Sequence, residues 1–128
     1  MQRNPARAMG EEAGHLLGWL RIAAGAGAWV TPGTTARVLG ISGAAGSPVR
    51  FVLRLFGSRD GALGLGLLGA ETASERDRWL VLGIATDIAD AAAAVVAGGR
   101  GQLPRGRALV AAASALAAVA LATRAREE

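Results

Sequence analysis

Four long apolar stretches dominate the chain, at about residues 15–31, 51–70, 79–98 and 106–123. Each has roughly 17–20 residues, the length with which an α-helix crosses the ~30 Å hydrocarbon core of a bilayer. Proline interrupts helix interiors and marks helix ends. All four prolines, which are Pro5, Pro32, Pro48 and Pro104, lie outside the stretches. The pattern therefore predicts an all-α fold, a four-transmembrane-helix bundle, in one domain over residues 1–128.

The segments between the stretches carry signals for helix ends. Thr72 stands three residues before Glu75, which is the spacing of a capping box at the start of a helix. Gly98 and Gly99 close the third stretch, where a helix end favours glycine. Residues 33–46 mix threonines and an arginine with apolar residues, which predicts a short interfacial helix or turn between the first two spans. The charged residues between 71 and 78 predict a solvent-exposed loop.

A water-soluble four-helix bundle is the alternative fold. Each helix would then need a polar stripe that faces water. Residues 61–70 consist of Gly, Ala and Leu alone, and residues 108–122 are apolar except for Ser114. Trp29 and Trp79 stand near the ends of spans, where membrane proteins carry an aromatic belt. The pattern favours the membrane bundle.

The composition agrees with this fold and excludes several kinds of function. Hydrophobic residues make up 52% of the chain and charged residues only 19%. There is no Cys and only one His, so we expect no disulfide, no thiol catalysis, no metal site and no metal cofactor. The 14 basic residues are all Arg, but they are scattered and few aromatic residues accompany them. We therefore expect no nucleic-acid partner.

The candidate site consists of charged residues inside the predicted spans, which are Arg21, Arg59, Asp60, Asp87 and Asp90. A charge at the centre of a bilayer costs ~2.5–3.5 kcal/mol on insertion scales, so such residues normally face the bundle interior and form pairs. Small residues share their helix faces at helical spacing. These small residues are Gly14, Gly18 and Gly25, then Gly57, Gly61 and Gly64, then Gly83 and Ala94. We expect the charged faces to be the faces at which the helices meet.

The three aspartates outnumber the two arginines. Asp87 and Asp90 are three residues apart and therefore adjacent on one helix. Two carboxylates so close together resist joint ionisation unless an arginine lies between them. Arg54 could balance the surplus charge, or one aspartate could carry a proton. Such a pair is also suited to acid–base chemistry.

Two glycine patterns have a packing explanation. Residues 64–69 match Gly-x-Gly-x-x-Gly, but the dinucleotide fingerprint needs a preceding strand and a turn, and this segment is the interior of an apolar stretch. We therefore expect no nucleotide cofactor. Gly10, Gly14 and Gly18, and also Gly57 and Gly61, form Gly-x-x-x-Gly steps, which favour close helix packing within the chain or in a homo-oligomer.

The chain resembles a bacterial family of short four-helix integral membrane proteins that is catalogued as a domain of unknown function. The similarity extends from about Gly14 to Ala122 and rests on three motifs. They are an arginine in the first helix (Arg21), a Gly-x-Arg-Asp step in the second (Gly57 to Asp60) and an Asp-x-x-Asp step in the third (Asp87 to Asp90). This chain has Gly61 where such families carry Leu or Ala, which slightly weakens that helix. The resemblance implies a location in the bacterial cell membrane and implies no activity, cofactor or partner.

Three functions follow from these features. The first is a non-enzymatic accessory or structural membrane protein with a buried Arg/Asp network. Such a protein would contact the lipid bilayer and either another membrane protein or a second copy of itself. The second is a membrane enzyme in which Asp87 or Asp90 moves a proton of a lipophilic small molecule while Arg21 or Arg59 stabilises negative charge. The third is proton or small-solute passage.

The arginine count, six at one end of the bundle against five or six at the other, does not orient the chain in the membrane.

Overall fold

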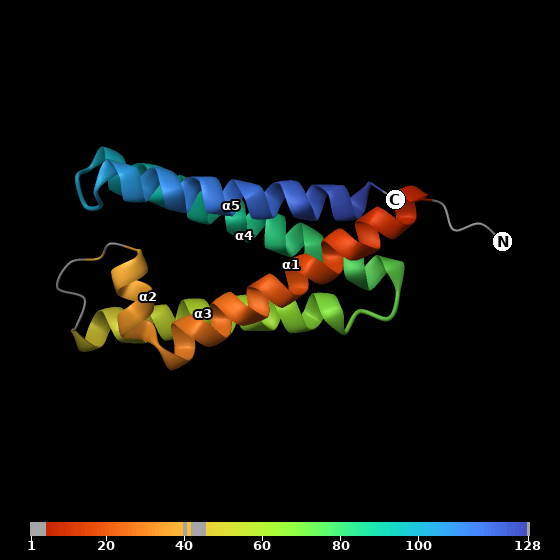
Figure 1. Cartoon of the computed structure of the whole chain (residues 1–128), viewed down its shortest axis with the longest axis horizontal. Coiled ribbons are helices and arrows are strands. Elements are labelled where there is room, and N and C mark those ends of the chain that lie inside the picture. The colour runs from red at the N-terminus through yellow and green to blue at the C-terminus, as the bar shows by residue number, and fades with distance from the viewer. Residues whose placement is uncertain (1–4, 40, 42–45, 128) are drawn as a thin grey trace.

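The computed structural model describes residues 5–39, 41 and 46–127, and within them it contains five α-helices and no strand (Figure 1). The all-α fold class is thereby confirmed. The helices are α1 (Pro5–Val30), α2 (Pro32–Val38), α3 (Ser47–Leu68), α4 (Ala73–Gly99) and α5 (Arg105–Arg126). Helices α1, α3, α4 and α5 cover the four apolar stretches almost completely. Helix α1 begins ten residues before the apolar run, with Pro5 as its first described residue, a position that a helix start tolerates.

The connection between the first two long helices contains the short helix α2. Pro32 stands in its first turn, and Ala36 is fully buried against Leu53 of α3. A short interfacial helix or turn was expected over residues 33–46, and α2 shows that the segment contains a helix. Part of the expected segment, residues 40 and 42–45, lies outside the described residues.

Helix α4 begins with the expected capping box. Thr72 Oγ1 accepts a hydrogen bond from the Glu75 N–H at 3.2 Å, and Glu75 Oε2 accepts from the Thr72 N–H at 3.1 Å. The N–H groups of Thr72 and Glu71 that donate to this carboxylate hold the pKa of Glu75 below its ordinary value. The expectation of a loop over residues 71–78 is wrong from Ala73 onward, because the capping box starts the helix there.

The long helices form two antiparallel hairpins. Helix α1 packs along α3 and α4 packs along α5, while α1 also meets α5 and α3 meets α4 (Figure 1). The start of α1, the end of α3, the start of α4 and the end of α5 lie at one end of the bundle. Helix α2 and the α4–α5 connection lie at the other end, where Arg107 donates a hydrogen bond to the Val38 carbonyl.

Glycines bring the backbones of α1 and α3 close together. A Cβ atom on Gly25 would lie 2.5 Å from the carbonyl oxygen of Gly57, and a Cβ atom on Gly57 would lie 2.5 Å from the oxygen of Gly25. Gly64 approaches the Gly18 carbonyl in the same manner. The expectation that the small-residue faces are packing faces is confirmed for this pair of helices.

Two of the long helices qualify as membrane spans by length and composition. They are α4 and α5, whose most apolar windows have mean hydropathy of 1.9 and 1.8. Helix α3 carries Arg54, Arg59 and Asp60, and α1 carries Arg21 among many glycines, which lowers their hydropathy. The expectation of four transmembrane helices therefore stays a prediction.

The candidate polar network

The five charged residues expected at the site come together between α1, α3 and α4. Arg21 of α1 stands at the centre of one group: its Nη1 donates to Asp60 Oδ1 of α3 at 3.1 Å, and its Nη2 donates to Asp87 Oδ2 of α4 at 2.5 Å. One guanidinium thus bridges carboxylates from two other helices. We call Arg21, Arg59, Asp60, Asp87 and Asp90 the polar network.

A second guanidinium forms a separate pair. Both Arg59 Nη atoms donate to Asp90, at 3.2 and 2.7 Å, which is the bidentate geometry that suits an arginine and a carboxylate. Arg59 Nη2 also lies 3.9 Å from Asp60 Oδ1 and so connects the two groups. The Arg59 guanidinium lies 4.5 Å from the centre of the Phe56 ring, a cation–π distance.

The Arg21 group and the Arg59–Asp90 pair differ in burial. Arg21, Asp60 and Asp87 are 6%, 7% and 5% exposed, so their charges are removed from solvent. The side chains of Arg59 and Asp90 are 38% and 33% exposed. The network therefore extends from the bundle interior to its surface, and Arg21 is its most enclosed cation.

Glycines make the space for Arg21. A Cβ atom on Gly83 of α4 would lie 2.9 Å from Arg21 Nη2. A Cβ atom on Gly64 of α3 would lie 3.1 Å from Arg21 Cβ. Because the guanidinium occupies the position where larger side chains would lie, it reaches Asp87 across the gap between the hairpins. The small residues that share faces with the charges thus have a second role, which is to admit the arginine.

Arg54 does not neutralise the surplus carboxylate. Its Nε donates to the Trp29 carbonyl at 3.2 Å, and its guanidinium lies 5.7 Å from the Trp29 ring. Two arginines therefore serve three aspartates in the network. Asp87 and Asp90, which are neighbours on α4, pair with different arginines.

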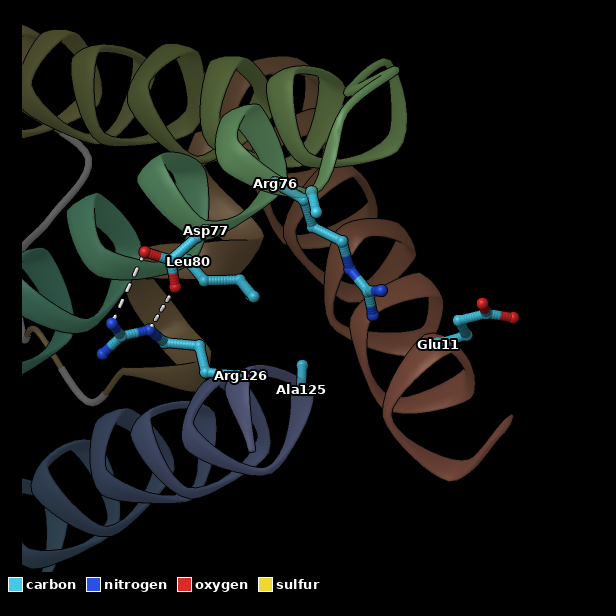
Figure 2. A pocket seen from close by; sticks show the side chains of 7 residues that line it. Glu11, Arg76, Asp77, Leu80, Ala125 and Arg126 are labelled. Atoms are coloured by element: carbon cyan, nitrogen blue, oxygen red, sulfur yellow. Dashed lines mark hydrogen bonds and ion pairs between the residues drawn. The ribbon is translucent and has the colours of Figure 1, made fainter. Parts of the chain in front are cut away.

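Sequence reasoning missed a set of contacts at the end of the bundle where α4 begins. Arg76 Nη2 donates to the Gly10 carbonyl of α1 at 2.7 Å, and Arg126 of α5 pairs with Asp77 at 2.6 Å. The capping box was the signal that could have found them, since it puts these residues on the first turns of a helix. Figure 2 shows Arg126 directed at Asp77 and Arg76 extended toward α1.

A pocket of about 450 Å³ lies at the same end (Figure 2). Its lining residues are Glu11, Ala73, Arg76, Asp77, Leu80, Ala125 and Arg126. None of them belongs to the polar network. Glu11 points away from the arginine–aspartate pair in Figure 2, so this pocket does not gather charges of one sign around a common point.

The described residues contain no group of three or more His, Asp or Glu side chains that could hold a metal ion. In the network, Arg21 pairs with Asp60 and Asp87, and Arg59 pairs with Asp90. The arrangement can therefore hold three helices together by charge.

Comparisons of the chain with protein-family models, with curated proteins and with solved structures gave no match. The resemblance to the bacterial four-helix family stays a prediction.

Proposed function

We propose that this protein is a small, non-enzymatic integral membrane protein that spans the bilayer four times and serves a structural or accessory role. In this proposal, the polar network fastens the α1/α3 hairpin to the α4/α5 hairpin. The resemblance to the bacterial family supports a location in the bacterial cell membrane.

The observation that carries the proposal is the inverted distribution of polar and apolar side chains. Arg21 and Asp87 are buried, whereas Trp19, Leu65 and Leu109 are 64%, 65% and 69% exposed. The buried apolar residues are mainly Ala and Leu in small clusters. A soluble bundle exposes its charges and buries its largest apolar residues. Lipid is the solvent that makes the opposite arrangement favourable.

The burial of α4 and α5 points the same way. Only 22% of the most apolar window of each helix is buried inside the protein. An equally apolar helix in a soluble protein would be largely buried in the core. The remaining surface of α4 and α5 needs an apolar environment outside the chain.

Four hydroxyl groups inside the long helices have hydrogen-bond partners without water. Ser58, Thr86, Ser114 and Thr123 each donate to the carbonyl four residues earlier, at 2.8–2.9 Å. Such bonds inside a helix let a hydroxyl lie in hydrocarbon without losing a partner.

Pairing supports the transmembrane placement of the charged helices α1 and α3. Arg21 and Asp60 contact each other, and Arg21 also contacts Asp87. Paired charges that face the bundle interior avoid most of the cost of a bare charge in the bilayer. The same pairing favours fastening over catalysis, because the Arg21 guanidinium already occupies both carboxylates.

Single-cysteine labelling tests the membrane placement, and the natural chain has no Cys to interfere. Ile88→Cys and Leu116→Cys place a thiol on exposed apolar surface within α4 and α5. Ser74→Cys and Gln102→Cys are matched controls near the two ends of α4. In isolated membranes, a charged maleimide should modify the controls and leave positions 88 and 116 unmodified until detergent is added. Modification of positions 88 and 116 without detergent would overturn the proposal.

A further inference from the structure

Charges outside the polar network are divided unequally between the two ends of the bundle. Apart from the network, the described acidic residues all lie at the end where α4 begins: Glu11, Glu12, Glu71, Glu75, Asp77 and Glu127. No acidic residue occurs in residues 13–59 or 91–126. At the opposite end, which holds α2 and the α4–α5 connection, the charged residues are therefore all basic.

The cations of that end are exposed. We call the set the basic end, and it consists of Arg37, Arg50, Arg100, Arg105 and Arg107. The structure joins segments that are distant in the sequence, since Arg107 at the start of α5 donates to the Val38 carbonyl of α2. Arg50, Arg100 and Arg105 make no side-chain hydrogen bond or ion pair with any described residue.

The basic end is unfavourable in isolation. Arginines repel one another when no carboxylate separates them, and Arg50, Arg105 and Arg107 stand in the first turns of helices, where the helix dipole is also positive. At the other end, Glu75 neutralises the first turn of α4. The counter-charge for the basic end must therefore come from outside the chain.

We propose that the basic end binds the phosphate groups of anionic phospholipids, and this inference rests on the proposed membrane placement. Large apolar side chains accompany the arginines: Trp29, Val38 and Phe51 are 53%, 67% and 61% exposed. Arginines beside exposed aromatic and aliphatic side chains suit a membrane interface, where headgroups and acyl chains meet. A nucleic acid offers phosphates without a matching apolar layer. The basic end consequently faces the leaflet that is rich in anionic lipid.

Native mass spectrometry of the full chain in neutral detergent tests the inference when equal amounts of phosphatidylglycerol and phosphatidylcholine are added to the protein. The wild type should retain more phosphatidylglycerol than phosphatidylcholine. Arg100→Gln/Arg105→Gln should reduce that preference by about fivefold for each arginine removed, hence roughly 25-fold. Arg78→Gln/Arg124→Gln makes the same change of charge at the opposite end and should keep the preference.

Three results would overturn the inference. The first is equal binding of the two lipids by the wild type, and the second is an equal loss of preference in both double variants. The third is binding of a DNA duplex that depends on Arg100 and Arg105, while phosphatidylglycerol is not preferred over phosphatidylcholine. The cysteine labelling separates these results from failure of the membrane proposal, because a chain protected at positions 88 and 116 is in the bilayer whatever lipid it prefers.

Discussion

Arg21 and Asp87 are 66 residues apart in the sequence, yet Arg21 Nη2 donates to Asp87 Oδ2 at 2.5 Å. The contact joins α1 to α4 and therefore joins the two hairpins. Arg21 also holds Asp60 of α3, so a single side chain connects three helices. We therefore expect the assembly of the bundle to depend strongly on Arg21.

Replacing Arg21 with Gln should destabilise the bundle strongly. Asp60 and Asp87 would remain buried without a cation, and breaking a buried ion pair from one side costs about 3–5 kcal/mol. Thermal unfolding in detergent, followed by circular dichroism, measures the loss. Unchanged unfolding of Arg21→Gln would show that the pairs do not fasten the hairpins.

Removing the charges of Arg21, Asp60 and Asp87 together should recover much of the stability that Arg21→Gln loses. The variant Arg21→Met/Asp60→Asn/Asp87→Asn leaves no buried ion, and an uncharged replacement of a buried ion pair is often neutral in stability. It should unfold at a higher temperature than Arg21→Gln. If the network instead carries catalysis or solute passage, the triple variant would fold but lose that activity, which separates a structural network from a chemical one.

The Arg59–Asp90 pair should contribute less. Its side chains are 38% and 33% exposed, so solvent weakens their attraction. A double-mutant cycle with Arg59→Gln and Asp90→Asn should give a coupling of about 1 kcal/mol in detergent. A coupling free energy as large as the destabilisation caused by Arg21→Gln would contradict the expectation that the exposed pair contributes less than the buried one.

A methyl group at Gly57 should push α1 and α3 apart. Its Cβ would lie 2.5 Å from the Gly25 carbonyl oxygen, and overpacking of this kind costs about 1–3 kcal/mol. Gly61→Ala is the matched control in the same helix, since its Cβ would meet no atom within 4 Å. The control should be neutral or stabilising by up to about 1 kcal/mol, because alanine favours helix more than glycine does. Equal destabilisation by both substitutions would refute the close approach.

The capping box should make the stability of α4 depend on pH. The pKa of Glu75 is lowered in the folded chain, so its carboxylate contributes fully above its ordinary pKa, about 4.3, and the contribution is lost as pH falls through the lowered value. Wild type should therefore exceed Glu75→Gln in melting temperature at pH 7 and lose that advantage in acid. Thr72→Ala should cost about 1 kcal/mol near pH 7. A difference between wild type and Glu75→Gln that grows as pH falls would contradict the role of the carboxylate.

Several features were predictable because they depend on local spacing. The apolar stretches and the prolines that bound them predicted the long helices. The interval between Thr72 and Glu75 predicted the capping box. The charged residues inside apolar stretches predicted the members of the network, because a charge in such surroundings needs a partner.

Other features required contacts that no local pattern contains. Arg54 lies only five residues before Arg59, but a carbonyl and a ring from α1 take its guanidinium away from the network. Arg76 and Asp77 were expected in a loop, and they contact α1 and α5 instead.

By itself, the sequence determined where the four long helices lie and which charges belong to the network, since both follow from the order of apolar, small and polar residues along the chain. Only the tertiary structure decided which arginine meets which aspartate. Arg21 could reach any of three carboxylates, and its choice of Asp60 and Asp87 follows from the space left by Gly64 and Gly83. The structure also brought five arginines from three segments to one end without a carboxylate among them. Charge pairing depends on distance in space, and helix packing sets that distance.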